Sequence, residues 1–161
     1  MSLSRVLPVR MLTVLPLVLA LSATMLVGYT LSPAAPKANA ALVSAAKANA
    51  AADWARSRKG SPYQYGATGP RRFDCSGLTR WVYSKVGKSL PHSSSAQVSR
   101  TERLSKSERR RGDLVFFYGY GGVYHVAIYA GQGYVWHASR PGVPVKRTKI
   151  WTSRVFYGRV K

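Results

Sequence analysis

The pattern of apolar residues changes near residue 113, and this change constrains the fold more than any other feature. Before it, residues 41–59 are rich in helix-favouring Ala, residues 75–87 carry apolar side chains at helical spacing, and Ser93-Ser94-Ser95 predicts the start of a further short helix. After it, strands are predicted in five runs rich in Val and aromatic residues: 113–117, 125–130, 134–138, 143–150 and 155–160. Helices followed by an antiparallel sheet indicate the α+β class. The residues between, 99–112, are predicted to be a polar, basic connector.

The N-terminus has the organisation of a secretory leader. An apolar stretch at residues 11–31 follows two arginines and is followed by small residues that end in Ala38-Asn39-Ala40. A positive start, an apolar middle and an A-x-A exit predict a signal peptide over residues 1–40. The apolar stretch is also close to the roughly 20 residues that cross a bilayer, so an uncleaved anchor over 11–31 is the alternative. In both cases residues 41–161 are expected to be exported.

The chain is strongly basic. It has 25 Lys and Arg against 5 Asp and Glu, a formal charge of +20, and loss of residues 1–40 would leave 22 against 5, or +17. Such a charge suits nucleic acid, an anionic membrane or an anionic cell wall. Export disfavours nucleic acid, so we expect the partners held by charge to be anionic cell-wall polymers. A solvated basic surface without any partner is the alternative.

Cys75 is the one cysteine of the chain, which excludes an intramolecular disulfide and any multi-cysteine zinc or iron–sulfur site. It is predicted in the first turn of the helix over 75–87, with Asp74 as the cap. At that place the helix dipole and free backbone N–H groups favour the thiolate and lower the thiol pKa. Cys75 is therefore a candidate nucleophile, and a small buried hydrophobic residue is the alternative.

Two of the three histidines are predicted to face the same way from neighbouring strands. If residues 131–133 form a three-residue hairpin loop, His137 lies opposite Ala127, and His125 points to the same face. The two imidazoles then suit a base for Cys75 and a group that orients this base. A closed zinc site would need a fourth ligand, which only the third histidine or an aspartate could supply. We expect neither a metal nor another cofactor.

Six short blocks of residues stand in a fixed order along the chain. They are Tyr63-Gln64-Tyr65-Gly66, Phe73-Asp74-Cys75-Ser76-Gly77-Leu78, Leu90-Pro91-His92-Ser93, Gly112-Asp113-Leu114-Val115-Phe116-Phe117, His125-Val126-Ala127-Ile128-Tyr129 and Trp136-His137-Ala138. In this order they resemble the NlpC-type cell-wall endopeptidases, a family of papain-like cysteine peptidases. The resemblance covers roughly residues 45–160. It implies a papain-like domain over 41–161, with N-terminal helices packed on an antiparallel sheet.

The resemblance also implies an activity, the hydrolysis of peptidoglycan stem peptides, typically at the bond between γ-D-glutamate and the diamino acid. Cys75 matches the family's nucleophile, His125 its base and His137 the residue that orients the base. The intermediate implied is a thioester on the cysteine. No cofactor is implied.

Three further positions match residues that the family uses around the reacting bond. Tyr63 matches the tyrosine whose hydroxyl lies near the reacting carbonyl. Asp74 and Ser76 match positions that help to recognise the amine end of the stem peptide. Capping of the helix is the alternative role for Asp74 and Ser76.

Some residues depart from the family pattern or are expected to be structural. Ala67 stands where a second glycine is common, and Arg109-Arg110-Arg111 stands where many relatives have a proline. We interpret the three arginines as surface charge. Tyr65, Trp81 and Trp136 are expected in the core rather than in the site.

Two classes of function remain beside the endopeptidase. One is an enzyme of the same fold that acts on another bond, such as a peptidoglycan amidase or an acyltransferase. The other is a non-catalytic basic module that binds the wall or disrupts membranes. In every case the expected location is extracellular or at the cell wall.

Overall fold

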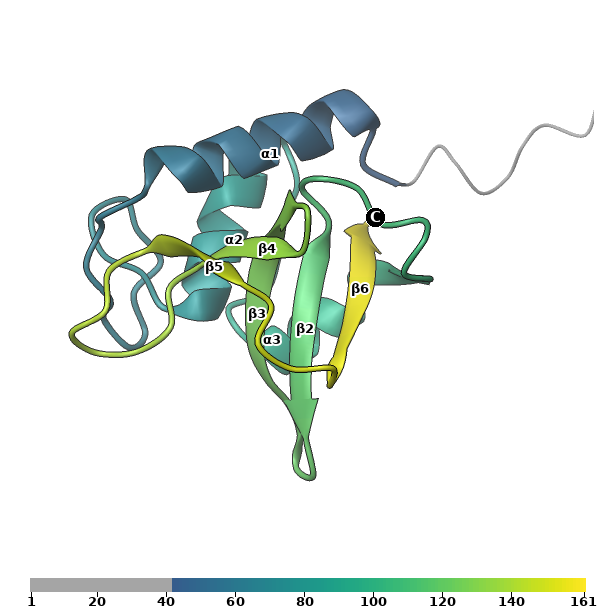
Figure 1. The fold of residues 1–161 in the computed structure, drawn as a ribbon. Coiled ribbons are helices and arrows are strands. Elements are labelled where there is room, and N and C mark those ends of the chain that lie inside the picture. The colour runs from purple at the N-terminus through teal and green to yellow at the C-terminus, as the bar shows by residue number, and fades with distance from the viewer. Residues whose placement is uncertain (1–41) are drawn as a thin grey trace, which may run out of the picture. The chain divides into compact units, whose positions relative to one another are not determined.

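The computed structural model describes residues 42–161, and the expected leader over 1–40 lies outside the described residues. Within them, the helices are α1 (Ala45–Ser57), α2 (Cys75–Ser84) and α3 (Ser94–Val98). The strands are β1 (Thr101–Leu104), β2 (Leu114–Gly119), β3 (Gly122–Gly131), β4 (Tyr134–His137), β5 (Lys146–Lys149) and β6 (Val155–Val160). They form one antiparallel sheet in the order β1-β6-β2-β3-β4-β5 (Figure 1). The α+β prediction is confirmed. No helix in the described part is long and apolar enough to cross a membrane.

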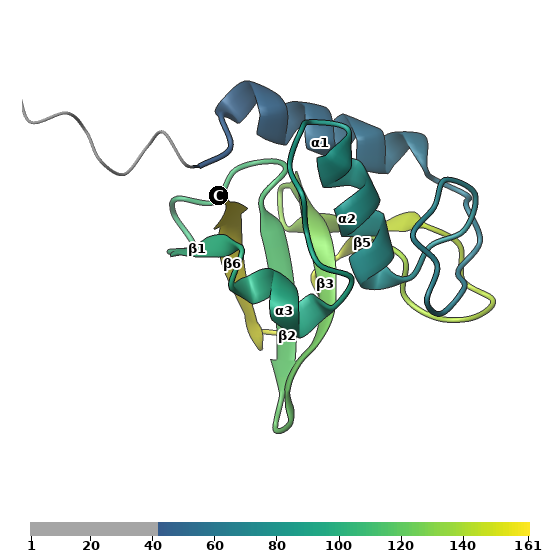
Figure 2. The same ribbon diagram turned by 180° about the vertical axis from the view of Figure 1, so that it is seen from behind.

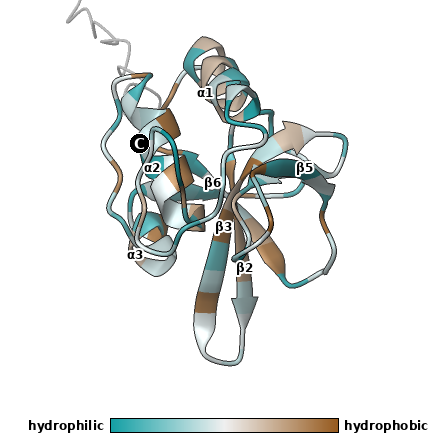
Figure 3. Cartoon of the chain, turned by 90° about the vertical axis from the view of Figure 1, so that its left-hand side faces the viewer, coloured by the Kyte–Doolittle hydropathy of each residue, from teal (hydrophilic) through white to brown (hydrophobic). Residues whose placement is uncertain are grey.

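The helices pack against one face of the sheet. Seen from behind, α2 and α3 lie in front of the strands, and α1 runs across one end (Figure 2). Helix α1 presents a strip of small side chains to this core, with Ala48, Ala51, Ala52 and Ala55 fully buried at helical spacing. The largest buried residues that α2 and the sheet contribute to this core are Leu78, Tyr83, Leu114, Phe116 and Ile128. In the side view, hydrophobic segments lie on α2 and on the strands beside it (Figure 3).

The opposite face of the sheet carries a second apolar cluster. Its buried members are Leu104, Val115, Phe117, Ala127, Tyr129, Val135 and Tyr157. Single side chains from the connections cover this cluster. Trp151 stacks on Phe117 with ring centroids 4.1 Å apart, and the Arg109 guanidinium lies over the rings of Tyr129 and Tyr157. This face therefore has a thinner cover than the face under the helices.

The hairpin between β3 and β4 has the register that the sequence predicts. The predicted three-residue loop is wrong in detail, because Gly131 still pairs with Tyr134 and only Gln132 and Gly133 form the turn. A bulge between Tyr129 and Gly131 compensates for the shorter turn, and Gly131, Gln132 and Gly133 all have positive φ angles. Ile128 pairs with Trp136 and Tyr129 with Val135. Continued by one residue, this register sets His137 opposite Ala127, as predicted. The pairing begins only at Ile128, so β4 leaves the first half of β3 uncovered at that edge.

The basic connector is more ordered than predicted. Part of it forms the edge strand β1, which pairs with β6. The interpretation of Arg109-Arg110-Arg111 as surface charge is wrong, because all three are half-buried and have partners. Arg109 Nε donates to the Tyr129 hydroxyl (3.0 Å), Arg110 donates to the Val43 carbonyl, and Arg111 forms an ion pair with Asp53 (2.7 Å). These arginines join the connector to the sheet and to the segment around α1.

The connector is also held from the sheet side. Asp113, two residues after Arg111, is fully buried and accepts two hydrogen bonds from Arg159 of β6, at 3.0 and 3.1 Å. An unpaired buried carboxylate would be strongly unfavourable, so Arg159 is needed to keep Asp113 inside.

Candidate active site

Cys75 is the first residue of α2, as predicted. Asp74 caps the helix, because its Oδ1 accepts the Gly77 N–H at 2.6 Å. The thiol is half-buried and receives a backbone hydrogen bond from Val126 of β3. The start of α2 therefore points at the edge of β3 that β4 leaves uncovered, next to His125.

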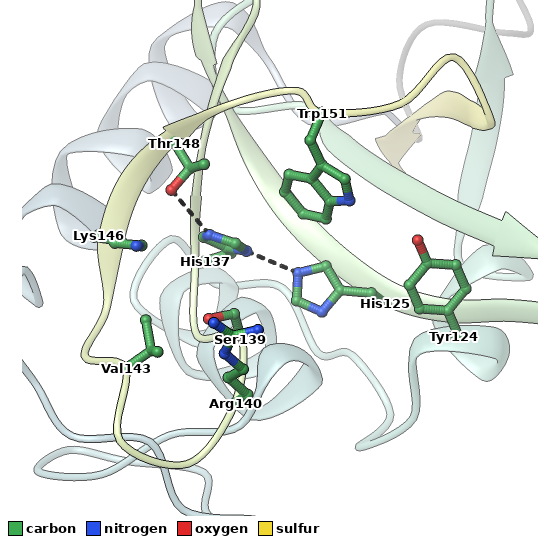
Figure 4. A pocket seen from close by; sticks show the side chains of 9 residues that line it. All are labelled: Tyr124, His125, His137, Ser139, Arg140, Val143, Lys146, Thr148 and Trp151. Atoms are coloured by element: carbon green, nitrogen blue, oxygen red, sulfur yellow. Dashed lines mark hydrogen bonds between the residues drawn. The ribbon is translucent and has the colours of Figure 1, made fainter.

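His125 and His137 lie side by side, as the hairpin register predicts. His125 Nε2 is 3.0 Å from His137 Nδ1, and His137 Nε2 is 3.1 Å from Thr148 Oγ1 of β5 (Figure 4). Both imidazoles are buried, with 7% and 4% of their surface exposed. Trp151 packs beside both rings. The strands and Trp151 thus fix the orientation of both imidazoles.

Burial keeps the thiol and the imidazoles neutral in the resting protein. It lowers the pKa of His125 to about 3, with a smaller contribution from His137, and it lowers the pKa of His137 to about 4, with a smaller contribution from Lys146. Burial also raises the pKa of Cys75, despite the opposing backbone hydrogen bond from Val126. The prediction that the helix start lowers this pKa is therefore wrong, because loss of water outweighs the helix terminus.

Asp74 is the centre of a hydrogen-bond cluster beside the thiol. Its carboxylate accepts the Gly66 N–H at 2.9 Å and the Ser76 hydroxyl at 3.2 Å, in addition to the Gly77 N–H. His92 Nε2 lies 2.8 Å from Asp74 Oδ2. From the sequence, His92 is expected only as a candidate fourth ligand of a zinc site. Its place in the block Leu90-Pro91-His92-Ser93 is a signal that could have identified it.

Tyr63 and Tyr65 lie on the loop before α2. Tyr63 is half-buried, and burial together with the nearby Cys75 raises the pKa of its hydroxyl. The prediction that Tyr65 belongs to the core is wrong, because 87% of its surface is exposed and it lines the cleft. Trp136 is buried as predicted, and Trp81 is half-buried against Phe73.

The loop itself packs tightly on the helix. A β-carbon on Gly77 would lie 2.0 Å from the Ala67 carbonyl oxygen, so only glycine fits there. Ala67, which stands where a second glycine is common, thus contacts α2 directly through its carbonyl oxygen.

Five of the six predicted site residues meet at one cleft of about 460 Å³. Of the predicted residues, it is lined by Tyr63, Asp74, Cys75, Ser76 and His125. His137 lies behind His125, in an adjoining cavity of about 430 Å³. Within residues 42–161, no group of three His, Cys, Asp or Glu side chains is arranged to hold a metal ion.

Known proteins share this sequence and fold. The NlpC/P60 family matches residues 60–160. A probable endopeptidase of Corynebacterium glutamicum is 47% identical over 128 residues, which cover 74% of this chain and 60% of that protein. The bifunctional muramidase/DL-endopeptidase CwlT of Bacillus subtilis is 38% identical over 113 residues, which cover 64% of this chain and 33% of that protein.

Solved structures give the same result. The NlpC/p60 domain of the peptidoglycan hydrolase SagA matches with a TM-score of 0.64 and 36% identity, over 71% of this chain and 98% of that one. The chain thus spans a whole domain of this kind and about 60% of the Corynebacterium relative. The fold, the sequence identity and the match over residues 60–160 show that the chain belongs to the NlpC/P60 family.

Proposed function

We propose that this protein is a secreted cysteine endopeptidase that hydrolyses peptidoglycan stem peptides at the bond between γ-D-glutamate and the diamino acid. One observation carries the proposal: a cysteine at a helix start lies in one cleft with a buried imidazole that a second imidazole and a threonine hydroxyl hold in place. The named relatives include endopeptidases and a peptidoglycan hydrolase, which supports the same class.

The hydrogen-bond chain supports His125 as the base. If His125 Nε2–H donates to His137 Nδ1, and His137 Nε2–H donates to Thr148 Oγ1, then His125 Nδ1 keeps its lone pair. That nitrogen accepts the proton of the Cys75 thiol. The thiolate and the imidazolium form together, because each charge stabilises the other where water is excluded. His137 thus orients the base and takes no proton from the substrate.

The reaction then has two halves. The Cys75 sulfur attacks the amide carbonyl, and the S–C bond forms while His125 holds the proton. The C–N bond breaks as His125 gives this proton to the leaving amine, and a thioester remains on Cys75. Water attacks the thioester with His125 as base, which releases the carboxylic acid and restores the thiol.

Groups around the thiol fit the charges that develop. The Cys75 backbone N–H, which starts the helix, and the Tyr63 hydroxyl would stabilise the oxyanion. Asp74 carries the negative charge that would bind a free amine at the amine end of the stem peptide. The Ser76 hydroxyl donates a hydrogen bond to this carboxylate. His92, paired with Asp74, would help to hold that carboxylate in place.

Digestion of purified peptidoglycan, followed by mass spectrometry of the new termini, tests the proposal. Cys75→Ala and His125→Ala are expected to abolish cleavage, and His137→Ala to leave a weak residual activity, because it only positions the base. Ser99→Ala, an exposed hydroxyl after α3, is the control and should keep full activity. Unchanged thermal midpoints would show that the variants fold.

The same digests separate the alternatives. Full activity in Cys75→Ala would overturn the mechanism. Release of intact stem peptides from the glycan would indicate an amidase, and transfer to an added amine would indicate an acyltransferase. A Cys75 thiol that does not react with alkylating reagents, with no cleavage by the native protein, would indicate a binding module.

The proposal includes the location and the charge of the protein. The leader over residues 1–40 would deliver the domain to the wall, either by cleavage or as an anchor. Anionic wall polymers would then attract the +17 domain. Three exposed basic residues gather on the segment around β1, which would be the main contact with such polymers: Arg100, Arg103 and Lys106.

A further inference from the structure

The cleft continues past His125 into a second cavity that the chemistry above leaves without a role. The two cavities share Tyr124, His125 and Ser139 as lining residues. Lys146 and Arg140 both line the second cavity, together with His137 of β4 and Thr148 of β5, and Trp151 lies on the side of the imidazoles opposite to Arg140 (Figure 4). The second cavity is therefore basic and directly adjoins the imidazole of the proposed base.

The two cations have no carboxylate partner within the chain. All five acidic residues of the sequence lie in the described part, and none lines this cavity. Three of them have side-chain partners elsewhere: Asp53 and Asp113 form ion pairs with Arg111 and Arg159, and Asp74 lies within hydrogen-bond distance of His92. Lys146 faces His137 directly across the β4–β5 pair. An anionic ligand group is thus the complement that this cavity lacks.

The direction of the proposed reaction says which part of the substrate enters. His125 must reach the leaving amine to protonate it, so the segment that carries this amine lies on the His125 side of the thiol. That segment ends in a carboxylate, and a diamino acid can carry a second one. At the other end of the cleft, Asp74 supplies a negative charge next to Cys75. The cleft is thus negative at one end and positive at the other.

We infer that the cavity beyond His125 is a carboxylate-binding pocket for the leaving segment of the substrate, with Lys146 and Arg140 as the residues that read the carboxylate. The inference rests on the proposed endopeptidase activity for its orientation. With an amine at the Asp74 end and a carboxylate at the Lys146 end, a zwitterionic peptide fits the cleft in one direction only. Lys146 and Arg140 are therefore specificity residues, and they take no part in proton transfer.

The alternation of β5 provides a matched control. Lys146 and Thr148 face the cavity, whereas Lys149 on the same strand lines a different cavity near Gln132 and Gly133. Lys149→Gln removes the same charge from the same strand without changing the proposed pocket.

The test uses two synthetic stem peptides that differ only in the leaving segment, where carboxylates are free in one and carboxamides in the other. For the native protein we expect kcat/KM to be about tenfold higher with the free acid, as for a charge-assisted hydrogen bond. The double variant Lys146→Gln/Arg140→Gln should lose this preference, because KM for the free acid rises to that for the amide. Lys149→Gln should keep the preference.

A binding measurement separates this inference from the proposed function. The leaving-segment product, as acid and as amide, is titrated into Cys75→Ala by calorimetry. If the acid binds more tightly than the amide, and this difference disappears when Lys146→Gln/Arg140→Gln is added, the pocket is supported. This holds even if the native protein cleaves neither peptide, and then only the proposed function fails. The inference is overturned if the native protein cleaves the acid and the amide with equal kcat/KM and Cys75→Ala binds the two products equally tightly.

Discussion

The two faces of the sheet are closed in different ways. Under α1, α2 and α3 the strands meet whole helices and a core of fully buried side chains. On the other face, the apolar cluster around Phe117 and Tyr129 is covered by Trp151 and Arg109, which come from connecting segments. One face is thus covered by helices, whose backbone hydrogen bonds are formed within the helix, and the other face is covered by single side chains.

The difference shows how the molecule divides stability from chemistry. His125 packs beside Phe117, with ring centroids 5.4 Å apart, so the imidazoles belong to the thinly covered face. Cys75 comes from the helix layer and meets them at the uncovered edge of β3. The helices thus hold Cys75, the proposed nucleophile, in a fixed place, and the other face contributes the two imidazoles beside it.

Phe116 and Phe117 allow the largest expected test of this comparison. They are neighbours on β2, both have no exposed surface, and they point to opposite faces. Phe116→Ala should lower the free energy of unfolding by about 3–5 kcal/mol, because helices and Phe156 prevent the cavity from closing. Phe117→Ala should cost about 2 kcal/mol, because Trp151 can settle into the space.

Denaturant unfolding of both variants measures these costs, and peptidoglycan digestion measures the effect on the site. Phe117→Ala should lose activity at temperatures where it is still folded, since Trp151 and His125 rest on that ring. Equal costs for the two variants, with equal activity, would show that the two faces are not different.

The buried imidazoles should make the second face sensitive to acid. Their pKa values are about 3 and about 4 in the folded protein, below the value near 6.5 of an unfolded chain. Below pH 6.5 the unfolded chain binds protons that the folded protein excludes. The free energy of unfolding is therefore highest above this pH. It falls as the pH is lowered toward 4, by up to about 1.4 kcal/mol per pH unit for each histidine.

Unfolding curves between pH 7.5 and 5 measure this slope, since carboxylates titrate mainly below that range. The double variant His125→Gln/His137→Gln should unfold with a nearly flat pH dependence over the same range. A slope that persists in the double variant would assign the acid sensitivity to other groups.

The sequence was sufficient where a pattern is local. The Asp74 cap, the start of α2 at Cys75 and the β3–β4 register each depend on neighbouring residues, and they place the thiol and the two imidazoles. Loop and strand contacts over long separations were not predictable in this way. Examples are Trp151 on Phe117, the His92–Asp74 pair, and Lys146 opposite His137.

Burial explains the two clearest errors. The thiol pKa was predicted from the helix terminus alone, whereas the position of β3, which the sequence does not define, removes water from Cys75. Arg109-Arg110-Arg111 were interpreted by composition, and their partners lie 20 to 67 residues away along the chain. Charge runs show how much charge a chain has, and tertiary contacts decide how much of it reaches the surface.

The smallest expected effect concerns that surface charge. Arg103→Gln/Lys106→Gln removes exposed cations beside the thinly covered face, and Arg56→Gln/Lys59→Gln removes as many from the helix layer. Binding of the native protein to purified walls should weaken as salt rises, because exposed charges are screened beyond about 8 Å at physiological ionic strength. If the segment around β1 is the main contact, the first variant should bind several-fold more weakly at low salt, and the second should stay close to native. Equal losses in co-sedimentation would mean that only the total charge matters, and binding indifferent to salt would exclude an electrostatic role for either face.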